Sequence, residues 1–157
     1  MDLKTLRKSI FEQFPTSVLE PVSKTQLAAI AREHPNVPTS YLDFLSEVGA
    51  GRIGKMGLAI YNGLCEPEEF FDRVVVEGLA GMLLFGDDFA GWHVGFDTRQ
   101  EWRIVSLESY SAPRRLIAYS RKRQASVNSW KDGFGIGEYW AYNSKRLELN
   151  HARRRIG

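Results

Sequence analysis

The stretch VPTSYLDFLSEVGAG, residues 37–51, holds the helix and the glycine exit on which the fold prediction depends. After Pro38, five large apolar side chains recur at helical spacing and form one broad face: Tyr41, Leu42, Phe44, Leu45 and Val48. Gly49 follows at the position where helices commonly end in a left-handed residue. The pattern therefore predicts a helix that begins after Pro38 and ends at Gly49.

Two further helices are predicted before this stretch. Apolar residues at spacings of three and four indicate a helix over residues 3–14, which Pro15 ends. A second helix begins at Ser23, because Ser23 and Gln26 have the spacing of a capping box, and Pro35 ends it. We expect these helices to come before any good strand.

Downstream of Gly49 the hydrophobic period changes from that of helices to that of strands. Residues 58–61 form a short apolar segment that Asn62-Gly63 should end as a turn. Residues 66–71 resemble the first turn of a short helix. Three strands are then predicted, joined by short connections that favour antiparallel pairing, over residues 82–85, 92–97 and 102–107. Helices followed by a strand meander predict an α+β fold.

Charge divides the chain into an acidic body and a basic C-terminal region. Residues 1–110 carry 10 Lys and Arg against 16 Asp and Glu, a net charge of −6. Residues 111–157 carry 11 against 3, a net charge of +8. In this region we expect only a strand at 116–119 and a helix at 125–131. No linker or repeat interrupts the chain, so we expect a single domain over residues 1–157.

The composition is that of a globular intracellular protein. Apolar residues make up 43% and charged residues 25% of the 157 residues. The N-terminus lacks the apolar run of a signal peptide, and no segment approaches the ~20 residues that span a bilayer. Cys65 is the only cysteine, which excludes an internal disulfide. We therefore expect a cytoplasmic protein with no membrane contact.

Three motifs invite a catalytic interpretation, and each lacks the context that its chemistry needs. GAGRIG, residues 49–54, matches the dinucleotide fingerprint, but it follows a helix and precedes a strand, the reverse of the required order. Gly86-Asp87-Asp88 resembles a polymerase metal turn, and a strand-ending turn with exposed acids explains it better. The three histidines lack metal-ligand spacing with Cys65, although a Cys65–His93 pair could meet in the fold. We expect no enzyme activity, no metal and no cofactor.

The succession of motifs between residues 37 and 108 resembles the SUKH superfamily, which includes Smi/Knr-type regulators and bacterial immunity proteins. The resemblance is carried by VPTSYLDFLSEVGAG at 37–51, LFGDD at 84–88 and WHVGFD at 92–97. It implies an α+β fold in which N-terminal helices pack on one face of a mixed or antiparallel sheet. The basic C-terminal third departs from the family pattern.

The resemblance also implies a function: an immunity protein that binds and blocks a cognate toxin, often a nuclease, encoded nearby. An acidic inhibitor surface suits a basic nuclease, because opposite charge speeds association. The residues expected to contact the partner are acids and one aromatic: Glu66, Glu68, Glu69, Asp87, Asp88 and Trp92. Trp92 could instead belong to the core.

Two other functions remain open. One is a regulatory or scaffolding domain of the same fold that binds a protein other than a toxin. The other is a nucleic-acid-binding module that uses the basic, aromatic-rich residues 114–155, since Lys and Arg neutralise phosphates and aromatics stack on bases. The acidic body argues against the second. Neither the oligomeric state nor the burial of Cys65 follows from the sequence.

Overall fold

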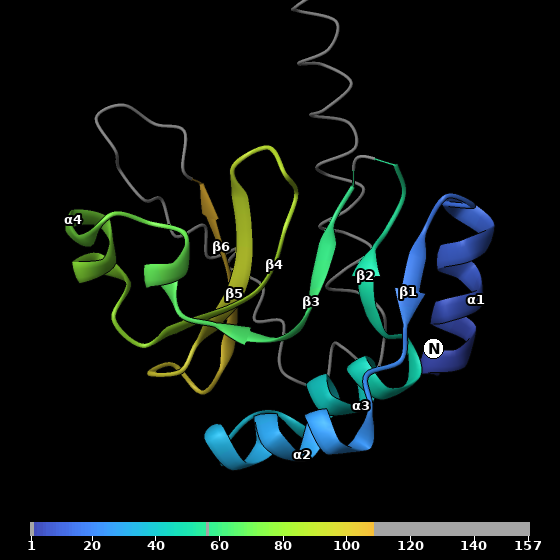
Figure 1. Cartoon of the computed structure of the whole chain (residues 1–157), viewed down its shortest axis with the longest axis horizontal. Helices are drawn as coiled ribbons and strands as arrows, with labels where there is room; N and C mark the ends of the chain where they lie inside the picture. Colours follow the sequence, from blue (N-terminus) through green and yellow to red (C-terminus); the bar gives the residue numbers. More distant parts are fainter. Residues whose placement is uncertain (1, 56, 109–157) are drawn as a thin grey trace, which may run out of the picture.

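The computed structural model describes residues 2–55 and 57–108, and these form a single antiparallel sheet with helices (Figure 1). The strand expected at 116–119, the helix expected at 125–131 and the basic region 111–157 lie outside the described residues. Within the described part, no helix combines the length and the apolar character needed to cross a membrane.

The three helices expected near the N-terminus are confirmed. They are α1 (Leu3–Gln13), α2 (Lys24–Glu33) and α3 (Thr39–Glu47). The Ser23 hydroxyl caps α2 by accepting a hydrogen bond from the Gln26 backbone N–H at 3.3 Å. Between the third and fourth strands lie three short helical turns, η1 (Pro67–Glu69), α4 (Arg73–Val76) and η2 (Glu77–Leu79).

In the part of the chain that the structure describes, six strands pair antiparallel in the order in which they occur in the sequence. They are β1 (Val18–Glu20), β2 (Ala50–Arg52), β3 (Ala59–Cys65), β4 (Met82–Asp87), β5 (Trp92–Asp97) and β6 (Arg103–Glu108). Together with the helices they make an α+β fold, as expected.

Two details of the expected order are wrong. β1 lies between α1 and α2, so the helices do not all precede the strands; this strand has only three residues, too few for an alternating pattern to be visible. Asn62 and Gly63 do not end β3 but lie within it, where the pairing with β4 shifts register. The Tyr41 hydroxyl donates to the Gly63 carbonyl at 3.0 Å, so a tertiary contact supports the irregular segment.

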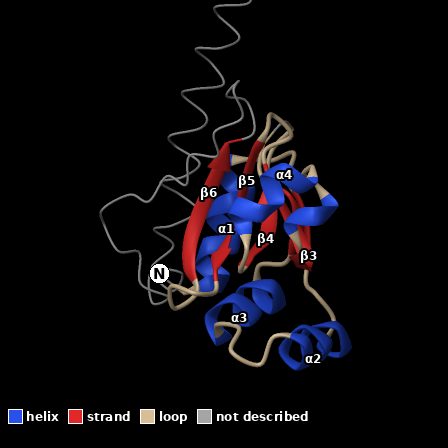
Figure 2. Ribbon diagram, turned by 90° about the vertical axis from the view of Figure 1, so that its left-hand side faces the viewer, coloured by secondary structure: helices blue, strands red, loops and turns tan. Residues whose placement is uncertain are grey.

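The strand β4, near the centre of the sheet, is buried on both faces. Phe85 and Leu84 are neighbours on β4 and therefore point to opposite faces. Phe85 belongs to the main core together with residues from α1, α2 and α3. Leu84 belongs to a smaller cluster with residues from η2 and β6. Figure 2 shows β6, β5, β4 and β3 side by side, with α2 and α3 together beyond one end of them.

The helix predicted from residues 37–51 lies at the centre of the main core. Four of its apolar side chains have no exposed surface: Tyr41, Phe44, Leu45 and Val48. Burial of side chains of this size contributes roughly 1.5–3 kcal/mol each. The rings of Phe85 and Phe96 lie 5.7 Å and 5.3 Å from that of Tyr41, so the helix is fixed against β4 and β5.

The glycines of the apparent dinucleotide motif allow two strands to come close together. Gly49 and Gly51 have φ of 106° and 132°. A Cβ on Gly51 would lie 2.1 Å from the Val18 carbonyl oxygen, and one on Gly49 would lie 2.5 Å from that of Glu20. The motif follows α3 as expected, but it is not only a connection, because β2 lies within it; the next element is β3, so no helix follows the motif as dinucleotide binding would need.

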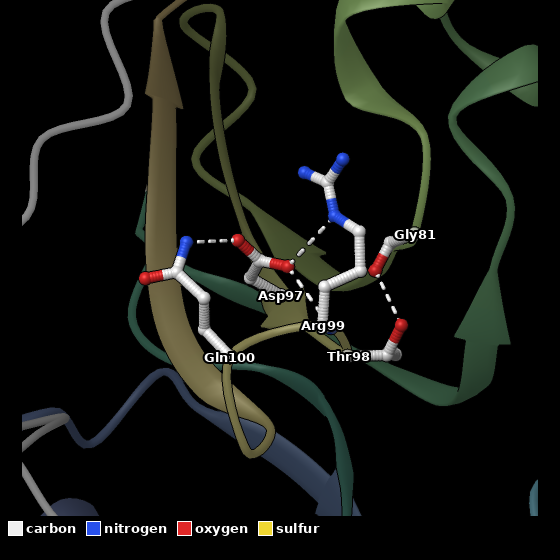
Figure 3. A network of polar contacts seen from close by, with 5 residues as sticks. All are labelled: Gly81, Asp97, Thr98, Arg99 and Gln100. Carbon is white, nitrogen blue, oxygen red and sulfur yellow. Dashed lines mark hydrogen bonds and ion pairs between the residues drawn. The ribbon is translucent and has the colours of Figure 1, made fainter.

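A buried carboxylate organises the turn between β5 and β6. Asp97 is 1% exposed and accepts hydrogen bonds from the Arg99 backbone N–H at 3.1 Å and from the Gln100 side chain at 2.6 Å (Figure 3). The neighbouring Thr98 hydroxyl donates to the Gly81 carbonyl at 2.7 Å. These contacts join the turn to the start of β4, which gives Asp97 a structural role.

Candidate partner-binding surface

The smaller sheet face is covered by the segment between β3 and β4. Leu79 from this segment packs with Met82 and Leu84 of β4 and with Val105 and Leu107 of β6. Tyr61, Cys65 and Phe71 pack against the same cluster. The connection is thereby held on the sheet, and its polar residues are displayed on the outside.

An acidic segment, defined as residues 66–77, forms most of this covering layer. It contains five acids, Glu66, Glu68, Glu69, Asp72 and Glu77, against one basic residue, Arg73, a net charge of −4. All six side chains are exposed. The Glu69 carboxylate accepts a hydrogen bond from the Glu66 backbone N–H at 3.1 Å, which closes the first turn of η1. The three glutamates expected to contact a partner are therefore brought together.

An aromatic stack holds this segment against the sheet. The rings of Phe70 and Tyr61 lie 5.7 Å apart with an interplanar angle of 9°. The His93 ring on β5 lies 5.3 Å from Phe70 and 4.9 Å from Phe71. Phe70 nevertheless remains 43% exposed. A packed, partly exposed aromatic ring thus lies within the acidic segment.

Asp87 connects the stack to the hairpin between β4 and β5. Its Oδ2 accepts a hydrogen bond from the Tyr61 hydroxyl at 2.7 Å, and its Oδ1 accepts one from the Phe89 backbone N–H at 2.7 Å. Burial, followed by the hydrogen bond to Asp87, raises the pKa of Tyr61 far above its usual value. Tyr61 therefore stays protonated and acts as a donor, while Asp87 remains half-buried at the edge of the acidic segment.

Asp88 is not the exposed acid that the sequence suggested. It is 6% exposed, and its Oδ1 accepts hydrogen bonds from the backbone N–H groups of Ala90 at 2.8 Å and Trp92 at 2.9 Å. A side chain that satisfies backbone donors two and four residues ahead shapes the turn. The expectation of a strand-ending turn is confirmed, but its two acids are not equally exposed.

The aromatic residues exposed on this side of the molecule differ from the one that was expected. Trp92 is half-buried at the start of β5. Phe89, at the tip of the β4–β5 hairpin, is 63% exposed and was missed, as was Phe70. Alternation along a strand predicts which strand residues face inward, but it says nothing about an aromatic inside a turn. The available signal was a phenylalanine among turn-forming residues in DDFAG, residues 87–91.

Cys65 on β3 and His93 on β5 both contact the layer that covers the smaller sheet face, and burial shifts the pKa of each. Burial, and secondarily Glu69, raises the pKa of the Cys65 thiol, which disfavours the reactive thiolate. Burial lowers the pKa of His93, which Asp87 and Asp88 partly oppose, so the imidazole is mainly neutral. Among the described residues, no group of three or more His, Cys, Asp or Glu is arranged to hold a metal ion.

Comparison with protein-family models, with curated proteins and with solved structures gives no match for this chain.

Proposed function

We propose that this chain is a protein-binding domain of the SUKH type that neutralises a basic toxin, such as a nuclease, by covering part of its surface. The acidic segment carries the proposal: its net charge of −4 lies on one layer of the structure, beside the exposed ring of Phe70. Aromatic residues are enriched in protein interfaces, and complementary charge gives specificity and fast association.

The chemistry of the smaller sheet face supports binding. The buried polar groups that could have served catalysis act within the fold: Asp88 holds a turn and Tyr61 donates to Asp87. The exposed ionisable side chains on this face are mostly carboxylates, which are negatively charged. A nuclease must be basic to hold its polyanionic substrate, so an acidic layer of this kind would be attracted to it and would repel nucleic acid.

The decisive experiment uses the product of a neighbouring reading frame. If that product is toxic, co-expression with this chain should restore growth, and the purified pair should bind with an affinity that falls as salt rises. A neighbour that is not toxic, together with no rescue by this chain, would overturn the proposed function.

Charge reversal then tests where the partner binds. Glu68→Lys combined with Glu77→Lys should weaken the Kd about tenfold at low salt, since exposed charges contribute up to about 1 kcal/mol each. Glu33→Lys combined with Glu47→Lys changes the net charge equally at exposed positions on α2 and α3. This control should leave the Kd within about twofold, because charges beyond the ~10 Å screening length contribute little. Equal losses in both pairs would exclude the acidic segment as the contact surface.

A further inference from the structure

The turn between β4 and β5 exposes the aromatic ring of Phe89 to solvent. Phe89 is 63% exposed, against 55% for Val18 and 43% for Phe70, the other exposed large apolar side chains among those that the structure describes. The turn lies at the end of the sheet opposite to α2 and α3 (Figure 1). A single exposed apolar side chain is common on protein surfaces, so a binding role for Phe89 depends on its backbone conformation and its neighbours as well as on its exposure.

The backbone of Phe89 has a conformation that disfavours phenylalanine. Its φ is 55°, in the left-handed region that a bulky L-residue rarely adopts. Gly91, two residues later, has φ of 96°, so the same turn places a glycine at its other left-handed position. Glycine or asparagine would fit position 89 with less strain. Strain of this kind concentrates at functional sites, where surrounding contacts maintain it.

Those surrounding contacts are visible in the turn. The Phe89 backbone N–H donates to Asp87 Oδ1, while Asp88 Oδ1 accepts from Ala90 and Trp92. The Asp88 backbone N–H also donates to the Trp92 carbonyl at 3.0 Å and closes the hairpin. The Phe89 backbone is thus held before any partner arrives, which reduces the entropy lost on binding.

The chemistry around the turn indicates which partner would fit. Asp87 pairs across the hairpin with His93, and the His93 ring contacts Phe70 in the acidic segment. Phe89 therefore extends from a turn whose base adjoins the aromatic stack and the acids. A complementary partner surface would combine an apolar pocket with cations at its rim.

We infer that Phe89 is the apolar anchor of the interface and that it enters an apolar pocket, rimmed by Lys and Arg side chains, on the basic protein partner. The inference rests on the proposed function, because it names the residue with which that binding would be made. The inference adds an apolar contact by Phe89 to the electrostatic attraction between the acidic segment and a basic partner.

The test separates binding from folding by replacing the ring with a residue that suits the turn. Phe89→Asn should weaken the Kd for the neighbouring toxin by at least about 30-fold, the loss expected of an interface hot spot. Its melting temperature should stay the same or rise, since asparagine tolerates the left-handed conformation. Val18→Thr is the control: Val18 is 55% exposed on β1, and threonine keeps the β-branched shape. It should leave the Kd unchanged.

The possible outcomes are distinct. If the wild-type chain binds the toxin and Phe89→Asn binds within threefold of it, the anchor is wrong and the proposed function stands. A Phe89→Asn variant that loses affinity together with melting temperature would show a structural role and overturn the inference. If the wild-type chain does not bind the toxin at any salt concentration, both proposals fail together.

Discussion

Asp88 accepts a hydrogen bond from the backbone N–H of Trp92, four residues ahead, at 2.9 Å, and a second from Ala90 at 2.8 Å. This buried carboxylate closes the β4–β5 hairpin from inside. The relationship explains why two adjacent aspartates that look alike in the sequence have different roles. Asp87 is half-buried at the edge of the acidic segment, whereas the buried Asp88 stabilises the turn.

Asp88→Ala should destabilise the protein by about 2–3 kcal/mol, because two backbone donors lose a charged acceptor. Asp88→Asn keeps an oxygen at the same position and should lose less than half of that. Urea unfolding followed by tryptophan fluorescence measures both. If Asp88→Ala and Asp88→Asn lost the same amount of stability, the negative charge of Asp88, and not the position of its acceptor oxygen, would stabilise the turn.

Gly51→Ala should destabilise the protein by about 3 kcal/mol, because the added Cβ meets the Val18 carbonyl oxygen at 2.1 Å on a backbone with φ of 132°. Gly63→Ala is the matched control. No atom lies within 4 Å of a Cβ at that position, so the free energy of unfolding should change by less than about 0.5 kcal/mol. A well-folded Gly51→Ala variant of normal stability would contradict the close pairing of β1 with β2.

Tyr41→Phe should destabilise the protein by about 1 kcal/mol, because it removes the hydrogen bond to the Gly63 carbonyl and keeps the packed ring. Tyr41→Ala removes the ring as well and should cost about 3–5 kcal/mol. The difference between the variants in denaturant unfolding separates the hydroxyl from the aromatic packing. Equal losses would mean that the hydroxyl contact supplies the whole contribution of Tyr41.

The stability of the protein should fall as the pH is lowered through the range below 6.5, in part because of His93. Burial lowers the pKa of His93 below its usual value of 6.5. The unfolded chain therefore binds a proton at a pH where the folded chain does not, and the linkage favours unfolding as the pH drops. The Nδ1 of His93 has no hydrogen-bond partner among the described residues, so a proton there gains no bond.

His93→Gln should flatten this part of the stability–pH curve. Unfolding in urea at several pH values between 5 and 7.5 compares the variant with the wild-type chain. An unchanged slope in His93→Gln would assign the pH dependence to other groups.

Local patterns were sufficient to predict α1, α2 and α3, and the strands that became β4, β5 and β6. The signals for these elements act over a few residues: side-chain caps at α1 and α2, apolar stripes along the helices, and short apolar segments for the strands. The predictions were wrong where contacts between residues far apart in the sequence determine the local structure. β1 is too short to show a period and exists because β2 pairs with it. Asn62-Gly63 has the composition of a turn, yet it lies within β3, where Tyr41 contacts it from 22 residues away.

The features of the candidate surface also divide into those that the sequence determines and those that the tertiary structure decides. The sequence by itself determined the α+β class and the charge of the acidic segment, because periodicity and charge are properties of residue types. Only the tertiary structure decided which acids are exposed and which aromatic rings extend outward. Asp87 and Asp88 differ in exposure because the hairpin turns the second carboxylate toward its own backbone donors. Phe89 is displayed because those same hydrogen bonds hold it in a conformation that its residue type disfavours.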